Sequence, residues 1–407
     1  MPIQFQHHTL PNGLTVLGEC NADAHTAAVG FFVNTGARDE DAPQMGVSHF
    51  LEHMMFKGTD RRTADDVNRE FDEIGANYNA YTSHENTAFF AQVLPEHLPR
   101  AIDLLGDILR PALRDDDFEI EKNVILEEIG MYEDRPQWRL QDALLERYFA
   151  DHPLGYRVLG TTDTIRQLDA SSMRQYFQHR YSPDNMVVAL SGRVDFEAVI
   201  KDLQRLAGDW PATGAQRDPA TPAIAALDQT IRDAKLSRHY LAALSPAPGA
   251  QDAQRYAARV LADVLGDTEG SRIYWALVDP GLAEEADLEF IPMDRAGAYM
   301  IYASCDPDEA DAVEAKLWAT IDALASKKDL DEAEVERAKN KLATEVMLRG
   351  ESTMGRMTEL GTHWLYQHEY TPLDEELRRI EAVTLDDLRQ LLTDYPFQPR
   401  GVLRLTP

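Results

Sequence analysis

The sequence predicts an α+β fold of two homologous domains, each a mainly antiparallel sheet packed against helices. In the first half of the 407-residue chain, segments typical of strands and of helices follow one another without regular βαβ alternation, which favours α+β. A proline-rich stretch at 211–222 then interrupts the periodic pattern. Beyond it, a pattern from the first half recurs, so we expect one type of domain to be present twice.

The first half is predicted to begin with two strands, at 12–20 and 27–34. Both segments are rich in Val, Leu, Phe and Thr and are bounded by Asn-Gly or Asn-Thr-Gly turns. Thr63 is a suitable N-cap for a helix that runs to Gly75. The other predicted elements are helices at 46–56, 96–110, 116–132 (with more helix to about 149) and 170–180, a strand or hairpin at 77–93, and a strand at 186–191.

The repeat joins a helix, a proline break and a strand. The second copy lies 215 residues after the first throughout (380 − 165 = 215), and a register kept over three elements favours duplication over chance. We therefore place domains at 1–211 and 230–407, joined by a linker at 212–229. The matching residues are Ile165, Leu168, Met173, Arg174 and Gln175 in the first copy, and Ile380, Val383, Leu388, Arg389 and Gln390 in the second.

The overall charge is strongly acidic. The chain has 70 Asp and Glu residues against 40 Lys and Arg, a formal net charge of −30. Such a surface repels phosphate backbones and anionic lipids, so nucleic acid and membranes are poor partners and basic peptides are better candidates. The alternative is that the charge only keeps the protein soluble.

Cysteine usage and the N-terminus bear on the cellular location. Cys20 and Cys305 stand far apart and form no CxxC pair, which excludes a disulfide scaffold. No apolar run approaches the roughly 18 residues of a membrane span. The N-terminus has neither a basic start nor an apolar stretch, so we expect a cytoplasmic protein, with a periplasmic protein trimmed of its leader as the alternative.

The strongest chemical signal is the pattern His49-Phe50-Leu51-Glu52-His53. One helical turn separates His49 from His53, so both rings share a face and can bind one zinc ion. Glu52 leans over the same side and can take a proton from water on that zinc, whose pKa falls towards about 7. This HxxEH order is the inverse of HExxH. Because so short a pattern also arises by chance, the interpretation needs a further ligand.

A catalytic zinc site usually takes a third protein ligand and keeps one position open. Glu121 and Glu128 are seven residues apart and lie on nearly one helical face, whereas Glu127 points elsewhere. Glu128 as a ligand, supported by Glu121, is therefore a candidate arrangement. The alternative is an ordinary solvated acidic helix face. The apolar residues expected to anchor this helix in the core are Val124, Ile125 and Ile129.

Several segments resemble the pitrilysin-type inverted zincins, and especially their mitochondrial-processing-peptidase-like branch. The resemblance covers residues 8–195 and is weaker in the second half. The family architecture, two homologous α+β domains per chain, agrees with the repeat. The segments that carry the resemblance are HFLEHMMFKGT (His49 to Thr59), EKNVILEEI (Glu121 to Ile129), HTLPNGLTV, NAYTSHENTAFF, HPLGYRVLGT (His152 to Thr161) and YSPDNMVVALSG.

The resemblance implies a zinc endopeptidase that hydrolyses peptides or unfolded segments inside a closed chamber. It implies a zinc-binding catalytic domain at 1–211 and a non-catalytic one at 230–407. The site residues that it implies are His49, His53 and Glu128 as ligands of Zn²⁺, Glu52 as general base, and Glu121 as the carboxylate behind a ligand.

The resemblance also implies how substrate is held. In that family the peptide adds a strand to a sheet edge, at positions that correspond here to Asn79, Ala80 and Tyr81. Pairing through the main chain reads the shape of an extended peptide more than its sequence.

One departure from the family pattern predicts a partner subunit. Self-sufficient members carry an Arg and a Tyr in a stretch like LREKRGLAY, which stabilise the tetrahedral intermediate. Val278 and Glu284 stand at these places here, and neither can donate to an oxyanion. We therefore expect a heterodimer whose homologous non-catalytic subunit supplies the pair, with a homodimer as the alternative. The candidate replacements after a local alignment shift are Arg272 with Tyr274 and Arg295 with Tyr299.

Two other functions compete with a peptidase. A non-catalytic scaffold or peptide-binding subunit would be like the degenerate family members built into respiratory complexes. Such copies usually lose one of the His or Glu residues, whereas this chain keeps all four. A zinc hydrolase of small molecules has no supporting feature beyond the shared metal chemistry.

Overall fold

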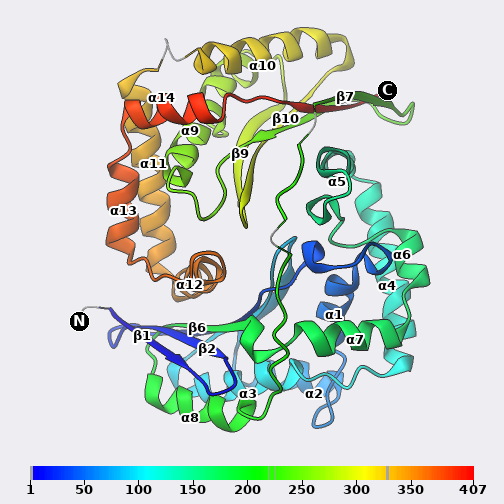
Figure 1. The fold of residues 1–407 in the computed structure, drawn as a ribbon, viewed down its shortest axis with the longest axis vertical. Coiled ribbons are helices and arrows are strands. Elements are labelled where there is room, and N and C mark those ends of the chain that lie inside the picture. Colours follow the sequence, from blue (N-terminus) through cyan, green and yellow to red (C-terminus); the bar gives the residue numbers. More distant parts are fainter. Residues whose placement is uncertain (1–2, 219, 225, 327–329) are drawn as a thin grey trace. The chain divides into compact units, whose positions relative to one another are not determined.

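Two separate units make up the fold (Figure 1). The computed structural model describes residues 3–218, 220–224, 226–326 and 330–407. Unit 1 contains the chain up to Met131 together with Tyr156–Asp218 and Leu348–Tyr370. Unit 2 contains Tyr132–Gly155, Pro219–Met347 and Thr371–Pro407.

Unit 1 is a six-stranded sheet with helices on both faces. Its strand order is β1-β2-β6-β3-β5-β4, and every neighbouring pair is antiparallel except β2 with β6. The strands are β1 (Gln4–Thr9), β2 (Thr15–Cys20), β3 (Ala27–Val33), β4 (Asn77–Thr82), β5 (Thr87–Val93) and β6 (Met186–Gly192). The helices are η1 (Ala37–Asp39), η2 (Ala42–Gln44), α1 (Val47–Met55), α2 (Ala64–Glu73), η3 (Pro95–His97), α3 (Leu98–Ile108), α4 (Asp115–Glu133), α6 (Thr162–Gln167), α7 (Ala170–Arg180), η5 (Pro183–Asn185), α8 (Phe196–Ala207) and α12 (Thr353–Gln367).

Unit 2 is a five-stranded sheet, again with helices on both faces. Its order is β7-β11-β8-β10-β9, with β7 and β11 parallel and the other pairs antiparallel. The strands are β7 (Leu227–Arg232), β8 (His239–Pro246), β9 (Glu285–Met293), β10 (Ala296–Cys305) and β11 (Gly401–Thr406). The helices are α5 (Pro136–Phe149), η4 (Pro153–Gly155), α9 (Arg255–Gly266), the π-helix η6 (Tyr274–Val278), η7 (Pro307–Glu309), α10 (Ala310–Ala325), α11 (Glu332–Glu351, which ends in unit 1), α13 (Leu373–Glu381) and α14 (Leu385–Asp394).

The two sheets share one topology. The order β2-β6-β3-β5-β4 in unit 1 and the order β7-β11-β8-β10-β9 in unit 2 have their single parallel pair at the same place. The repeat also holds in three dimensions, because α7 and β6 begin 215 residues before α14 and β11 (385 − 170 = 215; 401 − 186 = 215). The predicted α+β fold of two homologous domains is therefore confirmed.

The division between the units differs from the contiguous domains expected at 1–211 and 230–407. Helix α5 comes from the first half of the chain but lies in unit 2, and helix α12 comes from the second half but lies in unit 1. In unit 1, Met357 and Leu360 of α12 pack on Phe32 of β3. In unit 2, Leu140 and Leu144 of α5 pack among buried residues of β8 and β11. Each such buried side chain contributes about 1.5–3 kcal/mol, which holds the exchanged helices in place.

Close packing of α12 on β3 depends on two small residues. A Cβ on Gly30 of β3 would lie 2.5 Å from Met357 Sδ of α12, and one on Gly361 of α12 would lie 2.3 Å from the ring of Phe32. Both distances are well below van der Waals contact, so only glycine lets the helix approach the sheet this closely.

Most predicted helices and strands lie within a few residues of their expected bounds. Helix α7 covers the predicted residues 170–180, and Thr63 caps α2 through a capping box with Asp66. The prediction of three core residues on α4 was wrong for one of them. Ile125 and Ile129 are buried, but Val124 is 44% exposed, because it falls on the outer side of the helix. Strand β1 was not anticipated. None of the helices in the described ranges has the length and apolar character of a membrane span.

Candidate metal centre

Helix α1 carries the HxxEH pattern, and the backbone before it sets where the helix starts. Gly46 has a φ of 96°, and a Cβ there would lie 2.7 Å from the carbonyl oxygen of Leu159. The N–H groups of Gly46 and Ser48 both donate to the buried carboxylate of Glu40, at 2.7 Å each. A carboxylate at this position satisfies N–H groups that the helix itself leaves unpaired.

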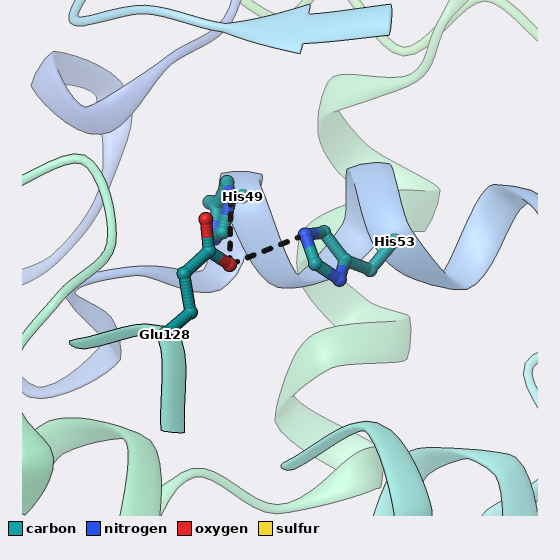
Figure 2. A group of neighbouring side chains, drawn as sticks. All are labelled: His49, His53 and Glu128. Carbon is teal, nitrogen blue, oxygen red and sulfur yellow. Dashed lines mark ion pairs between the residues drawn. The ribbon is translucent and has the colours of Figure 1, made fainter. Parts of the chain in front are cut away.

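His49 and His53 of α1 converge with Glu128 of α4 (Figure 2). Glu128 Oε2 lies 3.8 Å from His49 Nε2 and 3.6 Å from His53 Nε2. One donor atom from each residue lies within 4.8 Å of the other two. Zinc bonds of about 2.1 Å in tetrahedral geometry place donors about 3.4 Å apart, so small side-chain shifts would let the three hold one ion.

The pKa values of the two imidazoles are shifted in opposite directions. Burial, with the charge of His53 beside it, lowers the pKa of His49 to about 3, so this ring is neutral and able to bind metal at neutral pH. Burial also acts to lower the pKa of His53. The hydrogen bond and the charge of Glu121, with the charges of Glu128 and Glu52, outweigh burial and raise the pKa of His53.

Glu121 supports His53 from behind. Its Oε1 lies 2.7 Å from His53 Nδ1, and its Oε2 lies 2.5 Å from Lys57 Nζ. Although burial acts to raise the pKa of Glu121, the hydrogen bonds with His53 and Lys57 hold it below the usual value. An ionised Glu121 accepts the proton on Nδ1, which leaves His53 Nε2 as the atom that can bind metal.

Glu52 lies beside the three donors. Its Oε2 accepts a hydrogen bond of 2.7 Å from the hydroxyl of Thr82, the last residue of β4. Burial raises the pKa of Glu52 above its ordinary value. A carboxylate with a raised pKa next to a metal site is suited to proton transfer near neutral pH.

Sequence reasoning missed Lys57 and Thr82. Lys57 stands four residues after His53, and this spacing is the signal that could have placed it near the ligands. Thr82 had no such signal, because its contact with Glu52 joins residues 30 positions apart on different elements. Among the described residues, His49, His53 and Glu128 form the single cluster with metal-ligating geometry.

The predicted substrate-binding residues lie on an edge strand. Asn79, Ala80 and Tyr81 belong to β4, which pairs only with β5 among the described strands. Strand β4 packs against α1, the helix of the two histidines. An unpaired edge beside the candidate metal centre is where an extended peptide could add as a further strand.

The stretch expected to hold an Arg/Tyr pair contains no oxyanion donor at the two family positions. Val278 ends the π-helix η6, and Glu284 pairs with Arg238 at 3.0 Å. One member of each replacement pair is paired or buried within unit 2. Arg272 is bound to Glu334 at 2.6 Å, and Tyr299 is fully buried in the core of unit 2.

Zinc affinity is expected to fall as the pH is lowered through the raised pKa of His53. Below that pKa, zinc must displace a proton from His53, so the zinc affinity drops by up to about tenfold per pH unit. His49 adds no pH dependence to the zinc affinity above about pH 4. Titration with zinc against a competing chelator between pH 5.5 and 8.5 measures this. In Glu121→Gln the pKa of His53 falls, and the dependence near neutral pH should shrink. Affinity that stays constant from pH 6 to 8 in the wild type would contradict the assignment.

Comparison with known proteins relates both halves of the chain to one peptidase family. The sequence profile described as insulinase (peptidase family M16) matches residues 15–162. The profile described as the peptidase M16 inactive domain matches residues 167–342.

Relatives align along nearly the whole chain. An uncharacterized zinc protease of Mycobacterium tuberculosis (strain H37Rv) is 33% identical over 98% of this chain and 92% of its own length. An uncharacterized zinc protease of Bacillus subtilis (strain 168) is 31% identical over 96% of each chain. A solved structure of a protease from Helicobacter pylori covers all of both chains with a TM-score of 0.91 at 21% identity, which shows a shared fold.

Proposed function

The chain belongs to the insulinase family of peptidases (family M16), and from this we propose that it is a zinc-dependent endopeptidase of the mitochondrial-processing-peptidase-like branch. The observation that carries the proposal is the convergence of His49, His53 and Glu128, with Glu52 beside them. The substrates we propose are peptides or unfolded segments enclosed in a chamber. The net charge of −30 favours segments with basic residues.

The cofactor is Zn²⁺. The relatives are named zinc proteases, and two imidazoles with one carboxylate are a donor set that zinc takes in catalytic sites. His49, His53 and Glu128 would hold the ion, which supplies a Lewis acid and lowers the pKa of water towards about 7. Glu121 keeps His53 in the tautomer that can bind, because it accepts the proton on Nδ1.

Glu52 acts as the general base in this proposal. The Thr82 hydroxyl donates a hydrogen bond to Glu52 Oε2, and Glu52 Oε1 has no hydrogen bond within the described part of the chain. Oε1 is therefore the atom that takes the proton of the attacking water and passes it to the amine that leaves. The peptide lies along β4, where main-chain pairing at Asn79, Ala80 and Tyr81 presents the scissile bond to this carboxylate.

A second candidate is a non-catalytic scaffold or peptide-binding subunit of the same fold. Its support is the missing oxyanion pair and the family profile described as inactive for residues 167–342. Against it, the three candidate ligands lie together in unit 1, and Glu52 lies on the same helix as the two histidines. A zinc-loaded protein that stays inactive in every subunit combination would favour the scaffold.

The purified chain alone is expected to have little peptidase activity, because Val278 and Glu284 cannot stabilise an oxyanion. Loss of such a donor typically costs about 10²–10³-fold in kcat. We propose that this chain is the zinc-bearing subunit and that a homologous non-catalytic subunit supplies the Arg/Tyr pair, with a homodimer as the alternative.

Hydrolysis of a fluorogenic basic peptide by the chain alone, and after addition of a homologous subunit, measures the requirement. The matched control is the same assay with zinc removed and then restored, which separates a missing partner from a missing metal. Full activity of the isolated chain would contradict the need for a second subunit.

A further inference from the structure

The turn between β4 and β5 determines where Thr82 lies. Thr82 is the last residue of β4 and donates to Glu52, and the turn begins at the next residue, Ser83. Two main-chain hydrogen bonds tie this turn to η1. Ala37 N–H donates to Ser83 O at 3.2 Å, and Arg38 N–H donates to His84 O at 2.7 Å. A shift of the turn would therefore move the hydroxyl that orients Glu52.

Side chains from distant segments hold the same turn through Glu85. The carboxylate of Glu85, which is 4% exposed, accepts from Arg38 Nη1 at 2.6 Å and from the hydroxyl of Tyr366 of α12 at 2.9 Å. Its main-chain oxygen accepts from Arg217 Nη2. Arg217 lies in the stretch expected to be a linker, and yet its side chain is only 5% exposed.

Arg217 joins this turn to η1. Its Nε and Nη2 donate to the two oxygens of the buried Asp39 at 3.0 and 2.8 Å, while Nη2 also reaches the turn. Arg180 binds Asp39 at 2.9 Å and donates to the main-chain oxygen of Gln216 at 2.9 Å. The predicted linker is thus fastened to unit 1 on both sides of the Gln216–Arg217 peptide bond.

We propose that Arg217 is a positioning residue for the proton-transfer group Glu52. It bridges η1 and the 83–86 turn, so it keeps Thr82 in hydrogen-bonding distance of Glu52 and keeps the edge strand β4 in its place. The guanidinium is suited to this because one planar group donates in two directions at once. This inference rests on the proposed function of the site.

Loss of Arg217 would still leave each buried carboxylate that it contacts with an arginine partner. Without it, Asp39 still pairs with Arg180 and Glu85 still pairs with Arg38, so no buried carboxylate loses its last cation. Arg217→Gln is therefore expected to fold and to bind zinc. Arg217→Lys keeps the charge but cannot bridge Asp39 and the turn, so it should not restore the wild-type behaviour.

Hydrogen–deuterium exchange of the zinc-loaded protein tests the bridge without any need for activity. Arg217→Gln should raise exchange at least about tenfold in the segment 77–87 and leave α1 unchanged. Arg205→Gln, which removes an exposed arginine of unit 1, should leave exchange unchanged both in the segment 77–87 and in α1. If Arg217→Gln fails to fold, Tyr366→Phe removes the hydroxyl that binds the turn at Glu85 and Asn86, and it should raise exchange in the same segment. Unchanged exchange in 77–87 would overturn the proposal.

Kinetics of the active form of the enzyme then test whether the bridge acts through Thr82. Thr82→Val and Arg217→Gln should each lower kcat about tenfold with zinc content unchanged, and the double variant should lose no more than Thr82→Val alone. If the two losses of kcat multiply in the double variant, the proposal that Arg217 acts through Thr82 is overturned. A wild type with no activity in any subunit combination would refute the proposed function instead, and the exchange data would still decide whether Arg217 holds the turn.

Discussion

Glu52→Gln is expected to abolish peptide hydrolysis while zinc stays bound. Glutamine has the shape of glutamate, and its amide oxygen can still accept the hydrogen bond from Thr82. It cannot take a proton from water, so kcat should fall about 10²–10⁴-fold. Steady-state kinetics with a peptide substrate and elemental analysis of the same preparation measure both parts of the expectation.

Glu73→Gln is the matched control for this substitution, because Glu73 is an exposed glutamate at the end of α2, away from the metal centre. Its kcat and zinc content should equal those of the wild type. Turnover retained in Glu52→Gln would exclude Glu52 as the base. Loss of zinc together with turnover would instead mean that Glu52 takes part in binding the ion.

Glu128→Gln is expected to lower zinc affinity by more than about 100-fold. Residues behind metal ligands typically contribute 10–100-fold to affinity, and removal of a ligand should cost more. The amide is a much poorer zinc ligand than the carboxylate, and the two remaining histidines are one short of the usual three protein ligands. Zinc retained after dialysis against a graded chelator series gives the affinity.

Glu127 offers a control on the same helix. It is exposed and lies one residue, about 100° of helix rotation, from Glu128, so Glu127→Gln should keep wild-type zinc affinity. The zinc affinity of Glu121→Gln should lie between those of Glu127→Gln and Glu128→Gln, with a loss of about 10–100-fold. Stoichiometric zinc at wild-type affinity in Glu128→Gln would mean that a different residue completes the metal site.

Features that depend on neighbours in the chain were predictable. The capping box of α2 forms within four residues, Thr63 to Asp66. His49 and His53 share a face because any helix over that segment places residues four apart on one side. The duplicated topology was visible for the same reason, since both copies keep the same local pattern at an offset of 215 residues.

The resemblance to a known family supplied what periodicity alone left open. Spacing along α4 made Glu128 a candidate but did not distinguish a ligand from a solvated helix face. The same helix also shows where periodicity is imprecise, because Val124 was expected in the core and lies on the surface. A rotation of one residue, about 100°, separates a buried position from an exposed one.

By itself, then, the amino-acid order determined which stretches form helices and strands, that one fold occurs twice, and which residues could bind a metal. The three-dimensional packing alone decided that α5 covers the sheet of unit 2 and α12 the sheet of unit 1. It also decided that Lys57 and Thr82 support Glu121 and Glu52, and that the Arg217 side chain is buried and bound. The physical reason is range. Backbone periodicity and capping act over a few residues, whereas burial and charge pairing join any groups that packing brings together, whatever their distance along the chain.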